Sequence, residues 1–476
     1  MCLFRWIPVA VLVSVLAASF PVRAQDVQYW DNTYGTRSTL LSGAVIGSAT
    51  DLSATFYNPG ALALFQEPAF ILGARAWDFS SIQVRNSAGR GADLNTSISG
   101  PAADLVAGLF PVHFVSGDQL AYSFLTRQGS NLRVQMRTEA TADVTPAHPG
   151  DETFVGEVTL EQNLYESWTG LTWSVPAGKN VGVGVTQYVA YRSQRGRLQT
   201  LGQAFALDGQ VASATELKEF DFTDWRTVTK AGLQVRLASL TLGLNLTSPG
   251  LHLQGGGTVA VDTAITGFDL DGDGVANPVF IADQQRDVKA HYRSPLSVGL
   301  GAGCRAGSTG LHASAEWFDR LARYRVLDTA PFTSQSSRVR TESPIVDEAK
   351  SVLDLGVGLT QRFGEHLSGF GGFSLDRTPR VPGTALSVGA WDIYHVSSGA
   401  EFRLGRTDLI LGVVYSFGRE DVGQLADPGA GSGRGLGPGP SPDAEVRFNS
   451  LRVVFGFSYG AARQEPDRQP GASAAP

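Results

Sequence analysis

LTLGLNLT, residues 240–247, alternates leucine with a small or polar residue at every position. Because side chains point alternately to the two faces of a β-strand, a period of two residues predicts a strand with one apolar face. The same period returns at residues 353–360, 409–418 and 451–459. Alternation of this kind continues through most of the chain after residue 68, so we expect a fold made of strands rather than helices.

The composition favours a membrane barrel over a soluble enzyme or a bundle of membrane helices. The 476 residues include 56 Gly and only 2 Met, 17% are charged, and the mean hydropathy is −0.03. After the first 24 residues, no stretch reaches the roughly 18 consecutive apolar residues that a helical span needs. Barrel strands alternate lipid-facing and lumen-facing residues, which keeps the average hydropathy low.

The connections between the expected strands alternate in length. Tight turns, such as those near residues 176–180 and 405–407, are followed by longer polar segments, such as residues 138–162 and 197–217. Short periplasmic turns and long extracellular loops give this order in outer-membrane barrels. The candidate strands lie near residues 68–84, 102–115, 119–137, 163–176, 180–195, 218–237, 239–256, 286–305, 309–327, 347–363, 366–377, 387–404, 407–420 and 445–460.

An even number of strands brings both ends of a barrel to the same side of the membrane. Closure also satisfies every backbone group, which an open sheet in lipid cannot do. The sequence therefore predicts an all-β fold, a transmembrane antiparallel β-barrel of fourteen strands within residues 67–460. A large soluble β-sandwich or propeller is the alternative, but it does not explain the alternating loop lengths, and the sequence has no blade-length repeat.

The first residues read as an export signal. Arg5 precedes a short apolar run at residues 7–18, and Val22-Arg23-Ala24 offers a cleavage site before Gln25. We therefore expect residues 1–24 to be a cleaved signal peptide, with a retained membrane anchor as the alternative. Residues 461–476, rich in Pro, Ala and Gln, are expected to be a disordered tail.

Residues 25–66 do not alternate like the rest of the chain. Small residues dominate them, and Asn58-Pro59-Gly60 follows. Pro59 fixes φ and removes a hydrogen-bond donor, so taken alone the tripeptide marks a loop. About forty compact residues ahead of a wide barrel have room in its lumen, so the sequence predicts an N-terminal hatch that plugs the barrel. Small lumen-facing residues would leave space for it, namely Gly182, Gly184, Gly299, Gly301, Gly303, Gly356 and Gly358.

Three stretches of this segment, GAVIG (43–47), DLSAT (51–55) and YNPGAL (57–62), resemble the N-terminal hatch of the FadL-type outer-membrane transporters of long-chain fatty acids and hydrocarbons. In that family an Asn-Pro-Ala element is characteristic, and here Gly60 stands in place of the alanine. The resemblance extends more loosely over the mature chain, through the hatch and the fourteen strands.

The resemblance implies a function and a route. We expect a protein of the Gram-negative outer membrane that moves long-chain fatty acids or similar hydrophobic molecules by ligand-gated passive diffusion, with lateral exit through the barrel wall. A kink in the third strand would open that exit, and Gly129-Ser130-Asn131 lies where the alternation slips. A glycine at the extracellular end of the strand, without any such role, is the alternative. The expected ligand pathway in the hatch comprises Asn58, Pro59, Gly60, Leu62, Leu64 and Phe65.

One acidic loop has the start of a calcium motif. Asp269, Asp271 and Asp273 alternate, and such carboxylates can converge on one cation. The twelfth position is Phe280 rather than the glutamate of the full motif, so a solvated acidic loop is the alternative. No other cofactor is expected.

Other classes of function have less support. Scattered histidines give no catalytic pattern, so we expect no enzyme. The formal net charge of −7 and the lack of a basic run argue against nucleic-acid binding. A general diffusion porin for polar solutes is the alternative function, but it needs an unblocked lumen. The expected partners are a hydrophobic small molecule and outer-membrane lipid, and the protein is expected to be a monomer.

Overall fold

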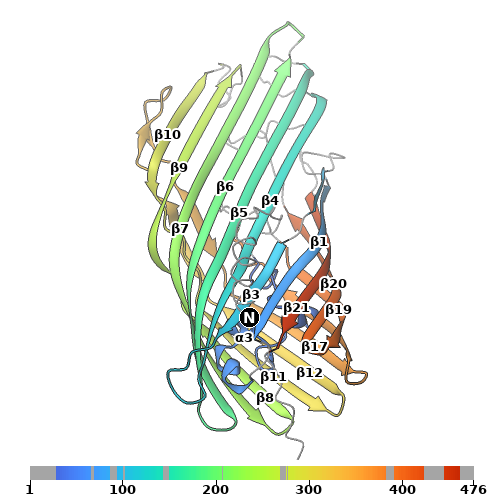
Figure 1. The fold of residues 1–476 in the computed structure, drawn as a ribbon. Helices are drawn as coiled ribbons and strands as arrows, with labels where there is room; N and C mark the ends of the chain where they lie inside the picture. The colour runs from blue at the N-terminus through green and yellow to red at the C-terminus, as the bar shows by residue number, and fades with distance from the viewer. Residues whose placement is uncertain are drawn as a thin grey trace, which may run out of the picture.

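The computed structural model describes residues 28–65, 69–85, 94–99, 102–142, 150–205, 207–267, 275, 277–381, 391–422 and 444–460. The strands form one antiparallel sheet that closes on itself, because β1 (Phe70–Arg85) pairs with the last strand, β21 (Ala444–Tyr459), along its length (Figure 1). Seventeen elements make up the closed sheet, since three of its fourteen strands are each interrupted once. The predicted all-β barrel of fourteen strands is therefore confirmed.

The interrupted strands are β2–β3, β8–β9 and β10–β11. In chain order the barrel elements between the first and the last are β2 (Leu94–Ser99), β3 (Ala102–Phe110), β4 (Gln119–Ala142), β5 (Glu152–Pro176), β6 (Val181–Phe205), β7 (Val211–Leu237), β8 (Leu240–Thr247), β9 (Leu251–Thr266), β10 (Val279–Lys289), β11 (Ser297–Ala306), β12 (Thr309–Phe318), β17 (Val352–Arg362), β18 (Leu367–Asp376), β19 (Ile393–Leu404) and β20 (Thr407–Val422).

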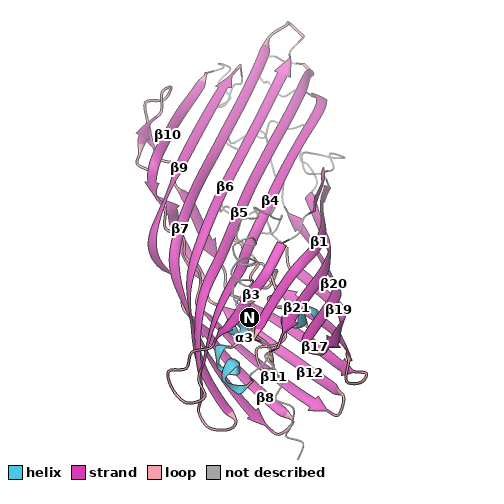
Figure 2. Cartoon of the chain, in the orientation of Figure 1, coloured by secondary structure: helices cyan, strands magenta, loops and turns pink. Residues whose placement is uncertain are grey.

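The barrel wall is much taller on one side than on the other (Figures 1 and 2). Strands β5, β6 and β7 have 25, 25 and 27 residues, whereas β12 and β18 have 10 each. The loops expected near residues 138–162 and 197–217 are largely strand, which corrects the prediction. These strand ends carry polar residues on both faces, so their sequence does not show the apolar alternation of a lipid-facing strand.

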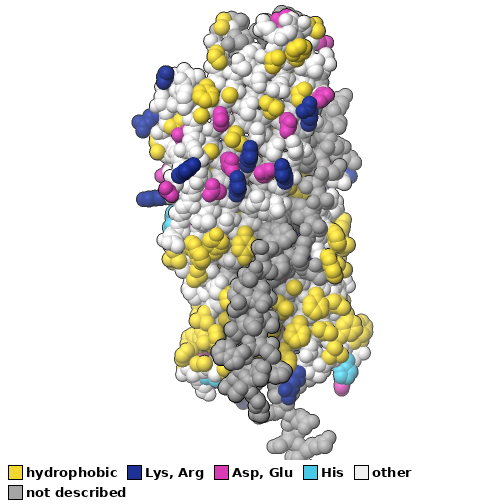
Figure 3. Space-filling view, turned by 45° about the horizontal axis from the view of Figure 1, so that its top comes forward, with side chains coloured by type: hydrophobic (Ala, Val, Ile, Leu, Met, Phe, Trp, Pro, Cys, Tyr) yellow, Lys and Arg dark blue, Asp and Glu magenta, His cyan; other side chains and the backbone are white. Residues whose placement is uncertain are grey.

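The apolar face of the alternating strands points outward. Leu242, Leu244 and Leu246 are each 40% or more exposed. The alternating residues Asn245 and Thr247 are buried. Figure 3 shows hydrophobic side chains gathered on the lower part of the outer surface and charged side chains on the upper part. An exposed apolar belt of this extent is stable against lipid rather than water. Among the described residues, no helix is both long and apolar enough to cross a membrane.

Residues 28–65, which we call the N-terminal segment, lie inside the barrel. They form α2 (Thr36–Leu40), α3 (Ala54–Tyr57) and the 3-10 helix η2 (Pro59–Leu64). Glycines let this segment approach the wall closely, since a β-carbon on Gly60 would lie 2.6 Å from the carbonyl oxygens of Gly182 and Gly232. The seven lumen glycines singled out in the sequence all lie against the segment.

The wall has one irregularity on its third strand. The ladder between β3 and β4 ends at the pair Leu105 and Leu125, and the register of β4 against β5 shifts between Thr126 and Gln128. The bulged residue is therefore Arg127. The predicted kink, Gly129-Ser130-Asn131, follows two residues later and pairs in regular register with β5.

A second interruption lies between the seventh and eighth strands. β8 pairs with β11 as far as Thr247 and Ser297, and β9 pairs with β10 only from Gly256 and Lys289 onward. The intervening residues 290–296 leave the wall, and the His291 amide donates to the Val326 carbonyl oxygen of a hairpin. That hairpin consists of β13 (Leu321–Leu327) and β16 (Ile345–Ala349), with β14 (Phe332–Thr333) and β15 (Arg340–Thr341) between them.

Candidate functional site

A cavity of about 40 Å³ lies in the lumen between the N-terminal segment, the tall wall and residues 290–296. We call it the upper cavity. The N-terminal segment contributes two aromatic side chains, and the strands of the wall contribute most of the rest. Its lining consists of Tyr29, Phe56, Arg127, Gln128, Glu166, Trp168, Arg226, Val228, Lys230, Thr247, Ser248, Tyr292, Ser294, Pro295, Ser297, Glu316 and Phe318.

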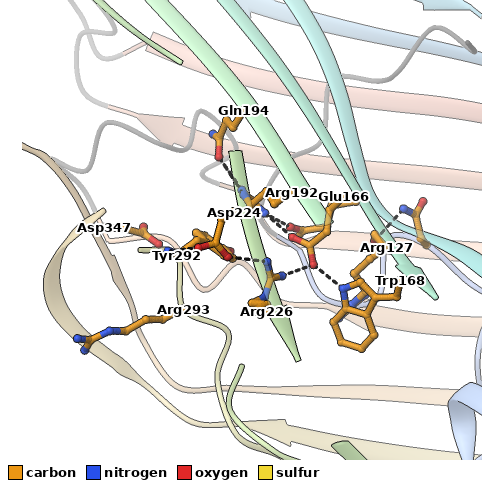
Figure 4. A network of polar contacts seen from close by, with 12 residues as sticks. Arg127, Glu166, Trp168, Arg192, Gln194, Asp224, Arg226, Tyr292, Arg293 and Asp347 are labelled. Atoms are coloured by element: carbon orange, nitrogen blue, oxygen red, sulfur yellow. Dashed lines mark hydrogen bonds and ion pairs between the residues drawn. The ribbon is translucent and has the colours of Figure 1, made fainter. Parts of the chain in front are cut away.

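Glu166 is the centre of a buried network of charges (Figure 4). Its Oε2 accepts a hydrogen bond of 2.8 Å from Arg192 Nη1, and its Oε1 accepts from Trp168 Nε1 at 2.7 Å and from Arg226 Nη2. The three residues Glu166, Arg192 and Arg226 are each at most 2% exposed. Tyr292 covers the two guanidinium groups, with its ring centre 3.9 Å from Arg192 Cζ and 4.8 Å from Arg226 Cζ.

Arg127 is held differently, by neutral groups. Its Nη1 donates to the Tyr29 carbonyl oxygen at 2.8 Å, and its guanidinium lies over the rings of Phe56 and Trp168. Within the described part of the chain, Arg127 makes no ion pair, although it is only 8% exposed. The bulge in β4 thus places a buried cation without a carboxylate partner next to the N-terminal segment.

Two further carboxylates complete the set. Glu316 lies 3.7 Å from Lys230 Nζ and accepts hydrogen bonds from Trp30 Nε1 and Ser297 Oγ. Asp224 lies 3.6 Å from Arg226 Nη1, and its Oδ2 contacts His252 Nδ1 at 2.7 Å.

Among the described side chains that line the upper cavity, positive charges outnumber negative charges by one. Its lining contains three cations, Arg127, Arg226 and Lys230, and two carboxylates, Glu166 and Glu316. Because buried charges are costly unless they are paired, the upper cavity is suited to a ligand that brings one negative charge.

The residues predicted for the ligand pathway lie elsewhere, between the N-terminal segment and the wall. Asn58 is fully buried, and its Nδ2 donates to the carbonyl oxygens of Ile46 and Leu233 and to Gln234 Oε1, at 2.8–3.0 Å. Its Oδ1 accepts from the Gly60 amide and so begins η2. Leu62 is buried in the core of the segment, and Leu64 and Phe65 are half-buried. Pro59 packs with Gly60 against Gly184 and Gly232.

A second and larger cavity, of about 860 Å³, lies on the other side of the N-terminal segment, at the end of the barrel with the tight turns. We call it the lower vestibule. Leu64 lines it, together with arginines near the ends of several strands, among them Arg236, Arg305, Arg362 and Arg403. Its carboxylates Glu401 and Asp408 both contact Arg37 and Arg403, whereas Arg305 and Arg362 are exposed and make no ion pair with any described residue.

Several sequence predictions lie outside the described residues. They are the signal peptide at 1–24, the acidic loop of Asp269, Asp271 and Asp273, and the tail at 461–476. In the part of the chain that the structure describes, no group of three His, Cys, Asp or Glu side chains could hold a metal ion.

The charged residues at the upper cavity are not among those predicted from the sequence. A signal for them exists, because Glu166, Arg192 and Arg226 each follow an aromatic residue, namely Tyr165, Tyr191 and Trp225. These aromatics are exposed or half-exposed on the outer face, so each neighbouring charge must point into the lumen. A charge that faces the lumen beside an outward aromatic indicates a polar site at the height of the membrane surface.

Comparisons with known proteins support the fold. No protein-family model and no curated protein matches the chain. Among solved structures, the toluene transporter TodX of Pseudomonas putida aligns over 91% of this chain and 100% of its own, with a TM-score of 0.58 and 14% identity.

Two further structures align similarly. A Pseudomonas aeruginosa FadL homologue covers 93% of this chain and 99% of its own (TM-score 0.54, 14% identity). The Ralstonia pickettii toluene transporter TbuX covers 90% of this chain and 98% of its own (TM-score 0.53, 11% identity). The chain therefore has the fold of the FadL-type barrels, as the resemblance of its N-terminal segment predicts.

Proposed function

We propose that this protein carries long-chain fatty acids or similar single-chain carboxylates through the outer membrane of a Gram-negative bacterium by ligand-gated passive diffusion. The observation that carries the proposal is the surplus positive charge of the upper cavity, centred on the unpaired Arg127. A carboxylate bound there would accept charge-assisted hydrogen bonds and balance the charge. A neutral hydrocarbon would leave that charge unpaired and would displace water from charged groups without compensation.

The N-terminal segment serves in this proposal as the hatch. Its contacts with glycines around the lumen support that role, as does the clamp that Asn58 forms with β7. A general diffusion porin is not favoured, because a segment packed against the wall narrows the path that polar solutes would need. Residues 25–66 would thus be the hatch and residues 67–460 the barrel.

The proposed exit is lateral, beside the bulge at Arg127. Two observations support it: the ladder between β3 and β4 ends at Leu125, and the register shift follows directly. Arg127 also holds the Tyr29 carbonyl oxygen, so a ligand that attracts Arg127 would loosen the start of the hatch. We keep Gly129, Ser130 and Asn131 as the part of β4 that borders this exit.

The location follows from the same proposal. The closed barrel and its outward apolar belt suit a membrane, and TodX, TbuX and the FadL homologue share the fold. Residues 1–24 would direct export and be removed. The protein would act as a monomer, with outer-membrane lipid around the belt.

Uptake measurements test the function. In Gram-negative cells that lack their own fatty-acid transporter, expression of this chain should support uptake of radiolabelled oleate but not of toluene. Preference for toluene, or no uptake of either compound, would contradict the proposal. Purified protein in a planar bilayer should show no large steady conductance, and an ohmic pore would favour the porin.

A further inference from the structure

The second interruption of the wall adjoins the upper cavity. Between the last pair of β8 with β11 and the first pair of β9 with β10, residues 248–255 and 290–296 form no continuous ladder with each other. Two long backbone hydrogen bonds cross the gap, from the Gly250 amide to the Ser294 carbonyl oxygen at 3.4 Å and from the Ala290 amide to the Gly255 carbonyl oxygen at 3.3 Å. Pro249 and Pro295 stand on the two edges of this gap, and neither has the N–H that a ladder needs. Thr247, Ser248 and Ser294, at the same gap, line the upper cavity. The cavity therefore extends to a place where the ladder between the two strands is broken.

Buried polar atoms without hydrogen-bond partners converge at this gap. They are Nε of Arg226, Oγ of Ser294 and Oγ1 of Thr247, each without a hydrogen-bond partner among the described residues. Arg226 is only 1% exposed. A β-carbon on Gly250 would lie 2.6 Å from Ser294 Oγ and 3.1 Å from Arg226 Nε, so both groups meet at Gly250. Buried donors left without acceptors are costly, and their convergence marks a place for an acceptor.

The outer face of the gap is apolar. Leu251 and Leu253 begin β9 and are 67% and 57% exposed. Trp225, which pairs with Gln254 in the neighbouring strand, is 39% exposed and lies 4.8 Å from the ring of Tyr191. An aromatic pair beside exposed leucines is typical of the membrane surface, where lipid meets the head-group region.

We propose that Arg226, Ser294 and Thr247 bind the carboxylate of a fatty acid whose chain extends through this gap to the lipid, a proposal that rests on the function proposed above. The size of the upper cavity supports it. Its volume of about 40 Å³ is far smaller than the roughly 300–1,000 Å³ of pockets that hold whole ligands. The head group fits and the chain does not, so the chain must leave the cavity.

The gap thus defines a second side port, distinct from the bulge on β4. Tyr292 is its inner cover, since its ring lies on Arg192 and Arg226 and its amide donates to Asp224 Oδ2 at 3.2 Å. A bound carboxylate competes with the Tyr292 ring for Arg226. Binding of the carboxylate is therefore coupled to movement of residues 290–296.

Binding of decanoate to the purified protein tests the head-group site. The double variant Ser294→Ala, Thr247→Val removes two donors and leaves Arg226 with Glu166, so decanoate affinity should fall by roughly 10-fold. Gly250→Ala places a methyl group against Ser294 and Arg226 and should also weaken binding. The control Gly256→Ala adds the same methyl group where the nearest atom, Val288 O, is 3.9 Å away, and should bind like wild type.

The outcomes separate the two proposals. If wild type binds decanoate and the double variant binds it equally well, the carboxylate site lies elsewhere. If wild type does not bind decanoate at all, the proposed function itself fails. Photocrosslinking with a fatty acid that carries a diazirine at its methyl end locates the chain. Adducts on Leu251, Leu253 or neighbouring lipid support the port, and adducts confined to residues 28–65 or to β4 overturn it.

Discussion

The upper cavity and the lower vestibule both contain arginines, but in opposite environments. At the upper cavity, Arg226 is almost fully buried and shares Glu166 with the equally buried Arg192. In the lower vestibule, Arg305 and Arg362 are exposed to a space of about 860 Å³. Water solvates an exposed guanidinium at little cost, whereas a buried one needs a partner. An unpaired arginine therefore indicates a ligand only in the upper cavity, and this difference can be tested region by region.

The largest expected difference concerns the carboxylate that each region uses to hold two arginines. Glu166→Gln leaves Arg192 and Arg226 buried with a neutral partner and should lower the free energy of unfolding by about 3–5 kcal/mol. Asp408→Asn removes a carboxylate of the lower vestibule that is 19% exposed and contacts Arg37 and Arg403. It should cost about 1 kcal/mol or less. Thermal unfolding in detergent measures both, and equal losses would contradict the comparison.

Loss of the Asn58 hydrogen bonds, which hold the hatch between the upper cavity and the lower vestibule, should have the next largest effect on stability. Asn58→Ala leaves the carbonyl oxygens of Ile46 and Leu233 and the side chain of Gln234 without their donor, at a cost of about 2–3 kcal/mol. Loosening of the hatch should also raise the conductance in planar bilayers. The control Asn163→Ala, on the exposed face of β5, should change neither quantity. A variant Asn58→Ala as stable and as closed as wild type would refute the clamp.

Ligand affinity should respond to one arginine and not to the other. Arg127→Gln removes the surplus charge of the upper cavity and should weaken decanoate binding by roughly 10-fold, or about 1.4 kcal/mol. Arg305→Gln removes a solvated charge of the lower vestibule and should leave affinity unchanged. Titration calorimetry on the two purified variants measures this, and the reverse order would move the proposed site to the vestibule.

Salt should have the smallest effect. Raising NaCl from about 0.05 M to about 0.5 M screens exposed charges strongly and buried charges weakly. Decanoate affinity should therefore change by less than about 2-fold if the upper cavity binds it. A steep loss of affinity with salt would instead indicate binding by the exposed arginines of the vestibule.

The sequence predicts the barrel well because lipid imposes a pattern on every strand. Leu240, Leu242, Leu244 and Leu246 show the period directly, and the tight turns mark one end. The sequence predicts loops for the upper parts of β5, β6 and β7, since outside the lipid neither face must be apolar. The full length of these strands is set by their pairing with neighbouring strands. A local sequence pattern does not show that pairing.

The site is harder to predict for a related reason. Glu166, Arg192 and Arg226 come from three strands, and only the register of those strands brings them together. Arg127 depends on a one-residue bulge, and the glycine that draws attention in the sequence lies two residues away. By contrast, Asn58-Pro59-Gly60 is recognisable because its conformation and its close approach to Gly232 are set locally.

The central claim is that the upper cavity recognises a negative head group on a hydrophobic chain. Its most direct test is the affinity of the purified wild-type protein for decanoate compared with 1-decanol, which has the same chain and no charge. Decanoate should bind at least about 10-fold more tightly, because only the carboxylate balances the buried positive charge. Equal affinities, or tighter binding of 1-decanol, would contradict it.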